Sequence, residues 1–222
     1  YILHKLYLVD QSVKQNLRNY NFHKLYKELL NFCALDLSSF YFDIRKDILY
    51  CEDLKSEKRK SCVELLNIIL ECLLRWYAPV LSFTTEEIYQ LILQDKNISI
   101  HEESFQKIPS IWKNDKLSEK WNKLVNIRQK VNASIEEKRS SKIIGSSLEA
   151  KVEINLPKID FDLLKEVDAK ELFIISDFTQ NLARDGEISV IVKKAEGSKC
   201  IRCWKIVSKV QDGKCSRCHK IK

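Results

Sequence analysis

The segment from Lys199 to Lys220 reads KCIRCWKIVSKVQDGKCSRCHK and decides how the end of the chain folds. It holds two C-x-x-C pairs, Cys200 with Cys203 and Cys215 with Cys218, separated by eleven residues. Asp212 and Gly213, just before the second pair, predict a turn that returns the chain to the first pair. A gap of two residues lets the backbone turn tightly, so both sulfurs of a pair can meet one ion. Two such pairs supply the four tetrahedral ligands of a structural zinc site and leave no position for water. We therefore expect one structural Zn²⁺, held by these four thiolates.

Two other interpretations of the cysteines remain open, because the pairs could instead be redox dithiols or form two disulfides. The other four cysteines are scattered through helix-like sequence and look like buried thiols: Cys33, Cys51, Cys62 and Cys72. The first residues show no secretory signal, and in a reducing cytosol paired cysteines favour a metal. His219 directly follows Cys218, where adjacency would spoil the geometry of the pair, so we leave it out as a ligand.

The charge of the chain is concentrated at this end. The net charge is +7, and residues 196–222 alone carry +6, which leaves a nearly neutral body. Five cations lie close to the cysteines: Lys199, Arg202, Lys205, Lys214 and Arg217. They could simply offset the charge of a four-thiolate zinc site, or they could also face the phosphates of a polyanion such as RNA. Trp204 could pack against the turn or stack on an unpaired base.

The first hundred residues predict helices that pack as a bundle. Apolar residues recur at steps of three and four from Ile2 to Tyr20, from Leu25 to Cys33 and from Cys62 to Trp76. The third helix should stop before Pro79. Thr84 followed by Glu87 matches a capping box, which predicts a further helix starting near Thr84. That helix should bury the apolar side chains of Ile88, Leu91 and Ile92.

The rest of the chain suggests a change of architecture. Residues 94–114 lose the helical period, and a long helix follows, with a possible basic stripe at its end: Arg128, Lys130, Lys138 and Arg139. Alternating apolar and charged residues predict a strand at 148–154, and β-branched residues predict another at 188–192. A helical stretch near 161–167 and an apolar run at 172–175 lie between them.

These patterns predict a mainly α protein, in which a helical bundle is followed by a small α/β module and a four-cysteine zinc knuckle. The expected segments are residues 1–97 for the bundle, 98–114 for a connecting loop, 115–145 for the long helix, 146–195 for the α/β module and 196–222 for the zinc domain. The composition, with 45% apolar and 31% charged residues, is that of a soluble globular chain. No run is apolar enough to span a bilayer. Because the chain has no Met at all, we expect a piece of a longer polypeptide. We also expect that polypeptide to be monomeric and, since no secretory signal is seen, cytoplasmic.

Four blocks of the sequence resemble, in order and spacing, the C-terminal region of bacterial-type isoleucyl-tRNA synthetases, which are class I aminoacyl-tRNA synthetases. They are DLSSFYFDIRKDILYCE (36–52), RWYAPVLSFTTEEIY (75–89), IEEKRSSKIIGSSLEAKV (135–152) and the cysteine tail. The resemblance implies a helical anticodon-binding domain of the class I type, a junction module and a C-terminal zinc domain that contacts the anticodon arm of an isoleucine tRNA. It also implies that the metal ligands are Cys200, Cys203, Cys215 and Cys218.

The resemblance further implies a parent enzyme, isoleucine–tRNA ligase, that attaches isoleucine to its tRNA using ATP. Its catalytic and editing domains would lie upstream on the same polypeptide, and ATP would bind only there. The HIGH-type and KMSKS-type motifs do not occur here, so the fragment alone should be non-catalytic. The residues that we expect to contact tRNA are Lys199, Arg202, Trp204, Lys205, Arg217 and Arg139.

Two rival functions stay open. The bundle also resembles those of valyl- and leucyl-type synthetases, although the terminal cysteines fit the isoleucyl type better. A zinc-stabilised module that docks other proteins and never touches RNA is the rival from a different class. The charged run at 43–47 could look like an acid/base group, but mixed charges between apolar residues are more often a salt-bridged surface.

Overall fold

The computed structural model describes residues 1–95 and 97–221. The chain divides into two compact units, Tyr1–Asp43 with Glu57–Asp115 and Ile44–Ser56 with Lys116–Lys222. The first unit is helical, and the second combines helices with two small sheets and the cysteine tail. The predicted fold class, mainly α with a small α/β module and a cysteine knuckle, is confirmed. The division into five consecutive segments stays a prediction.

In the residues that the structure describes, the first unit consists of four α-helices and a π-helix. They are α1 (Ile2–Arg18), α2 (Phe22–Asn31), the π-helix η1 (Phe32–Phe42), α4 (Glu57–Tyr77) and α5 (Ser82–Leu93). Two short 3₁₀ turns, η2 (Ile100–Glu102) and η3 (Ser110–Trp112), lie in the predicted connecting loop. Among the described residues, no helix combines the length and apolar character that crossing a membrane requires.

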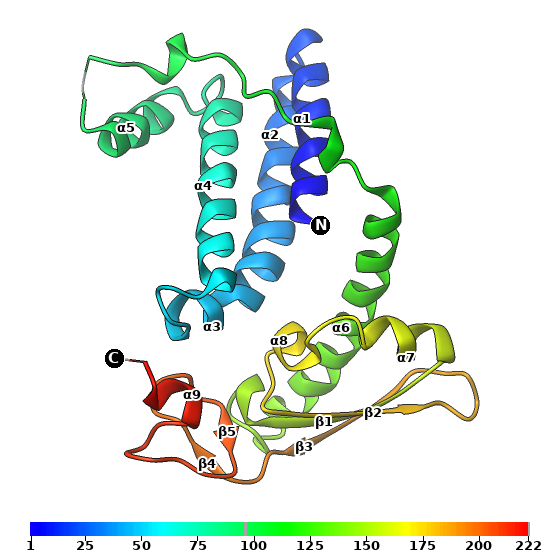
Figure 1. Ribbon diagram of the computed structural model, residues 1–222. Coiled ribbons are helices and arrows are strands. Elements are labelled where there is room, and N and C mark those ends of the chain that lie inside the picture. The colour runs from blue at the N-terminus through cyan, green and yellow to red at the C-terminus, as the bar shows by residue number, and fades with distance from the viewer. Residues whose placement is uncertain (96, 222) are drawn as a thin grey trace. The chain divides into compact units, whose positions relative to one another are not determined.

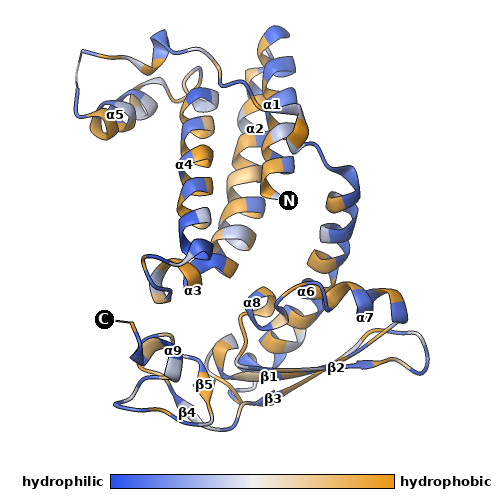
Figure 2. Cartoon of the chain, in the orientation of Figure 1, coloured by the Kyte–Doolittle hydropathy of each residue, from blue (hydrophilic) through white to orange (hydrophobic). Residues whose placement is uncertain are grey.

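Helices α1, α2 and α4 lie side by side in this unit (Figure 1) and carry apolar residues along their lengths (Figure 2). Leu6 and Val13 of α1, Leu25 and Leu29 of α2, and Trp76 of α4 are fully buried. The predicted periodicity therefore marks the core, since each helix buries one apolar stripe against its neighbours. The prediction is wrong for Tyr20, which lies beyond the end of α1 and is exposed.

The predicted capping box at Thr84 is wrong, because α5 begins at Ser82 and has no side-chain cap. The tight turn after α4 reverses the chain at once, with the amide of Leu81 donating to the carbonyl of Tyr77 at 2.7 Å. The neighbouring Glu86 makes a different contact: its carboxylate accepts a hydrogen bond from the amide of Ile100, in the loop that follows α5, at 2.9 Å.

The predicted burial of α5 is also wrong. Ile88 is 37% exposed, Leu91 71% and Ile92 50%, and Phe83 at the start of the helix is 92% exposed. Only Thr85 of this helix is buried. The helix contacts α4 and η2 along a narrow face, so most of its apolar residues remain on the surface.

The second unit contains a three-stranded sheet in the order β2-β1-β3. Its strands are β1 (Ala150–Leu156), β2 (Asp177–Leu182) and β3 (Ser189–Lys194). β1 pairs with β2 in parallel and with β3 in antiparallel register. The crossover from β1 to β2 passes through α7 (Lys158–Leu164) and α8 (Ala169–Phe173). Every second residue of β1 is buried, which places one face of the sheet in the core and confirms the predicted alternation.

The long helix α6 (Asp115–Ser140) begins at the predicted residue and contributes its apolar side to the second unit. Arg128, which we considered for a basic RNA-contacting stripe, is only 7% exposed. Its Nε donates a hydrogen bond to the carbonyl oxygen of Leu172 at 2.8 Å, so it joins α6 to α8. The prediction of a basic, RNA-contacting stripe is therefore wrong for Arg128, which is buried in the core.

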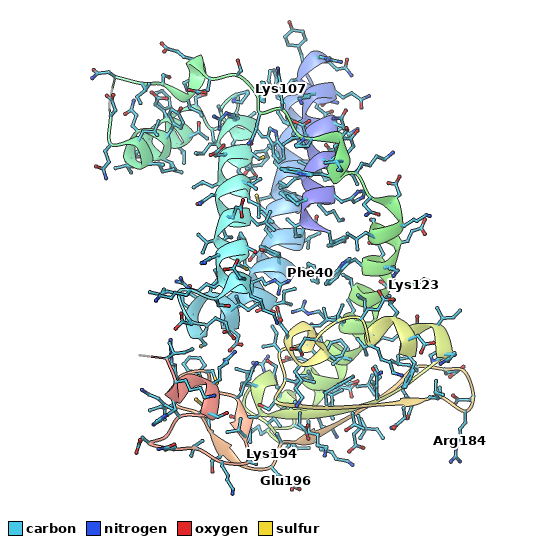
Figure 3. The ribbon with its side chains drawn as sticks, in the orientation of Figure 1. Phe40, Lys107, Lys123, Arg184, Lys194 and Glu196 are labelled. Atoms are coloured by element: carbon cyan, nitrogen blue, oxygen red, sulfur yellow. The ribbon has the colours of Figure 1, made fainter. Side chains whose placement is uncertain are left out.

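Two further parts of the second unit position the cysteine tail. The first is the helix α3 (Asp43–Cys51), most of which belongs to this unit. The second is the tail itself, with the short strands β4 (Ser198–Lys199) and β5 (Ile206–Val207) and the single-turn helix α9 (Ser216–His219). Lys194 and Glu196 mark the passage from β3 into this tail (Figure 3).

Candidate metal centre and nucleic-acid interface

The first cysteine pair lies in a tight turn that closes the hairpin of β4 and β5. Ser198 pairs with Val207 and Lys199 with Ile206 in this two-stranded ladder. The amide of Cys200 then donates to the carbonyl of Lys205 at 3.0 Å, and the amide of Trp204 donates to the carbonyl of Cys200 at 2.9 Å. These bonds fold residues 200–205 into a knuckle, as the C-x-x-C spacing predicts.

The second pair follows the predicted turn at Asp212 and Gly213, whose φ angles are +50° and +74°. Gln211 and Lys214 flank this turn and exchange two backbone hydrogen bonds of 2.8 and 2.9 Å. Positive φ at both central residues is the signature of a tight hairpin turn, which Asp and Gly favour.

The single-turn helix α9 then places the last two ligands. The Sγ of Cys215 caps this helix by accepting a hydrogen bond from the amide of Cys218 at 3.5 Å. The amide of Ile201 donates to the carbonyl of Gly213 at 2.9 Å and so ties the two knuckles together.

The four sulfurs of the quartet converge on one point. The Sγ atoms of Cys200, Cys203, Cys215 and Cys218 all lie within 4.8 Å of one another, and those of Cys203 and Cys215 are 3.8 Å apart. A tetrahedral zinc ion with Zn–S bonds of about 2.3 Å requires sulfurs about 3.8 Å apart. All four residues are buried, and their thiols are not joined in disulfides. The geometry therefore fits four ligands around one metal ion.

The protonation of the quartet also suits a bound cation. Burial alone would raise the pKa of Cys200, but hydrogen bonds from backbone amides, including those of Cys203 and Cys215, lower it to about 6. Burial raises the pKa values of Cys203 and Cys218. Cys203 and Cys218 therefore lose their protons more easily when a bound cation compensates the buried negative charge.

Helix α3 completes the surroundings of the quartet, which the sequence did not reveal. Cys51, at the end of α3, belongs to the same buried cluster as the four cysteines, and Val207 packs against it. The Sγ of Cys51 lies 3.8 Å from the carbonyl oxygen of Arg202. The sequence neighbours of Cys51 give no sign of this contact, because its partner lies 151 residues further along the chain.

Two of the predicted RNA-contacting cations are engaged by α3. Arg217 donates to both carboxylate oxygens of Asp47 at 2.6 and 2.7 Å and to Glu52 at 2.9 Å. The Nζ of Lys205 lies 3.3 Å from the carboxylate of Asp47. Arg217 and Asp47 reinforce each other's charge. The hydrogen bonds that Arg217 donates to Asp47 raise the pKa of Arg217, while contacts with Arg217 and Lys205 outweigh burial and lower the pKa of Asp47. These contacts confirm the salt-bridged interpretation for Asp47.

Two other predicted cations form more exposed ion pairs. Lys199 lies 3.6 Å from the carboxylate of Glu149. Arg139 lies 2.8 Å from Glu136, its neighbour one turn earlier in α6, and belongs to no part of the tail. Both cations are partly exposed, so these pairs are weak and leave them accessible to another anion.

Trp204 and Arg202 remain accessible. Trp204 is 60% exposed and is held with a positive φ of +63°, and Ile201, in the same knuckle, is 64% exposed. The structure gives Arg202 no ion pair among the described residues, and this residue is partly exposed. The tail therefore presents an aromatic ring, an aliphatic side chain and a cation together, which are the elements of a surface that stacks on a base.

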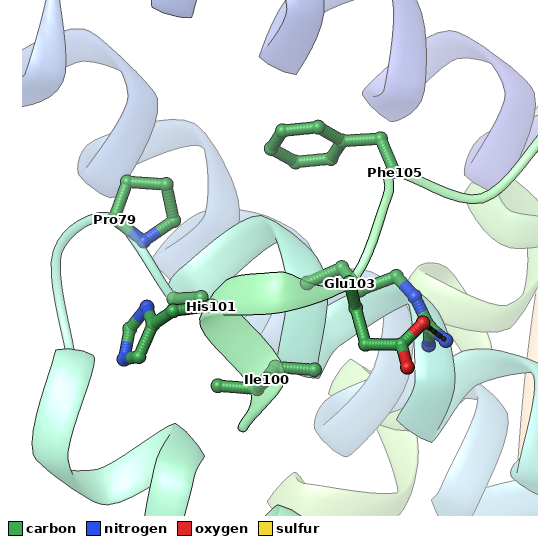
Figure 4. Close-up of a pocket in the computed structure, with 7 residues that line it drawn as sticks. Pro79, Ile100, His101, Glu103 and Phe105 are labelled. Carbon is green, nitrogen blue, oxygen red and sulfur yellow. Dashed lines mark hydrogen bonds and ion pairs between the residues drawn. The ribbon is translucent and has the colours of Figure 1, made fainter. Parts of the chain in front are cut away.

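A small cavity of about 130 Å³ lies in the helical unit beside the RWYAP sequence (Figure 4). Arg75 lines it and donates to the carbonyl of Ser104 at 3.1 Å and to Glu103 at 3.4 Å. Glu103 also accepts a hydrogen bond from the hydroxyl of Tyr89 at 2.9 Å. These contacts hold the 100–106 loop against α4, so the charged side chains of this cavity serve the packing of the unit.

Comparison with known proteins supports the resemblance to the C-terminal region of isoleucyl-tRNA synthetases. Residues 1–154 match the family described as the anticodon-binding domain of tRNA ligase. The chain is 52% identical over 206 residues to an isoleucine–tRNA ligase of Pelagibacter ubique, covering 93% of this chain and 23% of that protein. It is 37% identical over 218 residues to the isoleucine–tRNA ligase of Mesorhizobium japonicum, covering 92% of this chain and 22% of that protein.

The chain thus spans about a quarter of the length of the curated relatives that it matches. The family match extends over the whole helical unit, through α6 and into β1. Both relatives are isoleucine–tRNA ligases, which confirms the resemblance seen in the four sequence blocks. The chain belongs to the family of tRNA ligase anticodon-binding domains.

Proposed function

We propose that this chain is the tRNA-binding C-terminal part of an isoleucine–tRNA ligase, and that it holds the anticodon arm of an isoleucine tRNA. The observation that carries the proposal is the joint presence of the anticodon-binding family match and an exposed Trp204 beside a four-cysteine centre. Arg202 supplies a cation in the same knuckle. Bases of a single-stranded loop are usually bound by stacking together with hydrogen bonds to their edges.

The metal that we propose for the quartet is a single structural zinc ion. Four cysteine ligands in two C-x-x-C pairs are typical of zinc, and a full set of protein ligands leaves no open position for catalysis. The ligands are Cys200, Cys203, Cys215 and Cys218, whose spacing fits tetrahedral coordination. Metal binding should supply much of the folding free energy of the tail, because its buried cluster contains few large apolar side chains.

The contribution of this part to the reaction of the parent enzyme is indirect. The parent would attach isoleucine to tRNA using ATP in catalytic and editing domains that lie elsewhere on the same polypeptide. The residues described here bind and orient the tRNA, and binding energy from contacts far from the reacting atoms can support the chemical step. We propose that the parent acts as a monomer in the cytoplasm.

The RNA-contacting residues form two sets. Trp204 and Arg202 would contact RNA directly, and Lys199 and Arg139 could add phosphate contacts, since their ion pairs are partly exposed. Lys205 and Arg217 are held by Asp47, so we assign them a supporting role. Neutralisation of several phosphates makes affinity fall steeply as salt increases.

A binding titration of the 222-residue chain tests the proposal. The isoleucine tRNA and a tRNA of another amino acid are titrated at two salt concentrations, with and without a zinc chelator. We expect preference for the isoleucine tRNA, weaker binding at higher salt and loss of affinity after chelation. Equal binding of both tRNAs would contradict specific recognition, and no RNA binding at low salt would favour the protein-docking alternative.

A further inference from the structure

Helix α3 carries the acidic residues that hold the cysteine tail. Asp47 lies on α3, Glu52 directly follows the helix, and both accept hydrogen bonds from Arg217 at distances between 2.6 and 2.9 Å. Asp47 also lies 3.3 Å from Lys205. The carboxylates of Asp47 and Glu52 are both only 23% exposed, so these ion pairs are shielded from water and salt more than a surface pair would be.

The two cations come from different halves of the metal centre. Lys205 stands two residues after Cys203 in the first knuckle, and Arg217 stands between Cys215 and Cys218 in the second. One carboxylate, that of Asp47, therefore reaches both knuckles. The planar guanidinium of Arg217 makes a two-armed contact with it, which fixes orientation as well as distance.

Two polar contacts join the tail to the α/β module: the amide of Ile206 donates to the hydroxyl of Ser176 at 2.7 Å, and Lys199 lies 3.6 Å from Glu149. Neither of them involves the second knuckle. The buried cluster around the metal centre consists of cysteines, with Val207 packed against it. Among the described members of that cluster, Cys51 of α3 is the one that comes from outside the tail. Cys51 contacts the backbone of Arg202, one of the two residues that we assign to RNA.

We propose that Asp47 is a positioning residue for RNA binding: it seats the metal-bound tail on α3 and so directs Trp204 and Arg202 outward. The inference rests on the proposed function, since it says how the RNA-binding surface is held. Lys205 and Arg217 are then the residues through which Asp47 holds the tail on α3; we call these three residues the seat. The opposite possibility is that Asp47 and Glu52 merely neutralise two cations that would otherwise bind phosphate.

Asp47→Asn separates these possibilities by the sign of its effect on RNA affinity. The substitution removes a negative charge and frees two cations, so a neutralising role predicts tighter binding of isoleucine tRNA. A positioning role predicts weaker binding, about fivefold or more, in line with typical coupling free energies between sites. Zinc transfer to a coloured chelator should also become about tenfold faster, as for other residues that support metal ligands from outside.

Glu166→Gln is the matched control. Glu166 lies in the same unit and pairs with Lys120 at 2.9 Å, with both side chains about half exposed. The Glu166→Gln substitution removes the same charge as Asp47→Asn but makes no change near the tail. The zinc transfer rate of this variant should therefore equal that of the unsubstituted chain. Glu52→Gln, which removes one of the contacts of Arg217, should give an intermediate effect.

The outcomes distinguish the inference from the proposed function. Tighter RNA binding by Asp47→Asn, or an unchanged zinc transfer rate in that variant, would contradict the proposal that Asp47 positions the tail. If the unsubstituted chain fails to bind RNA, the proposed function fails, while the zinc transfer rates still report whether Asp47 supports the tail. Circular dichroism of each variant should show unchanged helix content, since all three substitutions conserve shape.

Discussion

The α carbon of Gly197 faces the backbone carbonyl of Val207 where the chain enters the cysteine tail. A Cβ atom on Gly197 would lie 2.8 Å from the carbonyl carbon of Val207 and still closer to its oxygen, and φ at Gly197 is +130°. Both the close approach and the backbone conformation require glycine at this position. The hairpin of β4 and β5, which carries the first knuckle, depends on this contact.

Gly197→Ala should therefore destabilise the tail by about 1–3 kcal/mol through overpacking and backbone strain. The expected result is faster zinc transfer to a chelator, because the hairpin must separate to admit the methyl group. Gly186→Ala is the control, since Gly186 also has a positive φ of +76° but open space around its α carbon. Equal zinc transfer rates for the two variants would contradict the role of the close approach.

Cys215→Ser should release the metal from the tail while the helical unit stays folded. Serine is a poor zinc ligand, and the remaining three thiolates cannot complete the tetrahedron. Elemental analysis should show a loss of bound zinc, and circular dichroism should show nearly unchanged helix content. The Cys33→Ser variant, changed in the helical unit, should keep its zinc. Retention of stoichiometric metal by the Cys215→Ser variant would exclude Cys215 as a ligand.

Thiol reactivity should separate the scattered cysteines from the quartet. Burial raises the pKa of Cys72 to about 12 and also raises that of Cys33, whereas a free thiol titrates near 8.5. The thiolate is the reactive form, so both residues should alkylate slowly at pH 8 and faster as the pH approaches their raised pKa values. Mass spectrometry after timed iodoacetamide treatment measures this.

The quartet provides the internal comparison in the same experiment. Its four cysteines should be protected while metal is bound and should alkylate after chelation. Rapid alkylation of Cys72 at pH 8 in the folded chain would contradict its burial, and unprotected tail cysteines in the zinc-loaded chain would contradict metal ligation.

Trp204→Ala should weaken binding to the anticodon stem-loop by about tenfold, since stacking of one base on an aromatic ring contributes about 1–3 kcal/mol. Trp204→Phe should recover much of that affinity because it keeps an aromatic face. Zinc content should stay the same in both variants, since the ring is 60% exposed. Loss of zinc in Trp204→Ala with no specific loss of RNA affinity would assign the ring to packing.

Local sequence patterns predicted the parts of the structure that depend on neighbours along the chain. The C-x-x-C spacing predicted the convergence of four sulfurs, and Asp212–Gly213 predicted the turn that brings back the second pair. The apolar period of the helical bundle and the alternation at 148–154 were also correct in kind. These features arise from turn chemistry and side-chain period, which a single sequence contains.

Features that depend on distant partners were missed. β2 (Asp177–Leu182) gave no strand signal because Gln180 and Asn181 are polar and half of its residues are exposed. The seat on α3 was missed because Asp47 and Arg217 are 170 residues apart in sequence. Charge alone left open whether the cations of the tail offset the thiolates or face RNA, and only the tertiary structure shows that Lys205 and Arg217 already hold a carboxylate.

Arg128 illustrates the same limit and gives the last prediction. Its Nε donates to the carbonyl of Leu172 from a position that is only 7% exposed, and this bond joins α6 to α8. Arg128→Met keeps the aliphatic length but leaves the carbonyl without its donor, which should lower the free energy of unfolding by about 1–3 kcal/mol. Lys130→Met on the exposed side of α6 should cost less than about 0.5 kcal/mol. Urea unfolding followed by circular dichroism measures both, and equal midpoints would show that Arg128 does not stabilise the junction between the two helices.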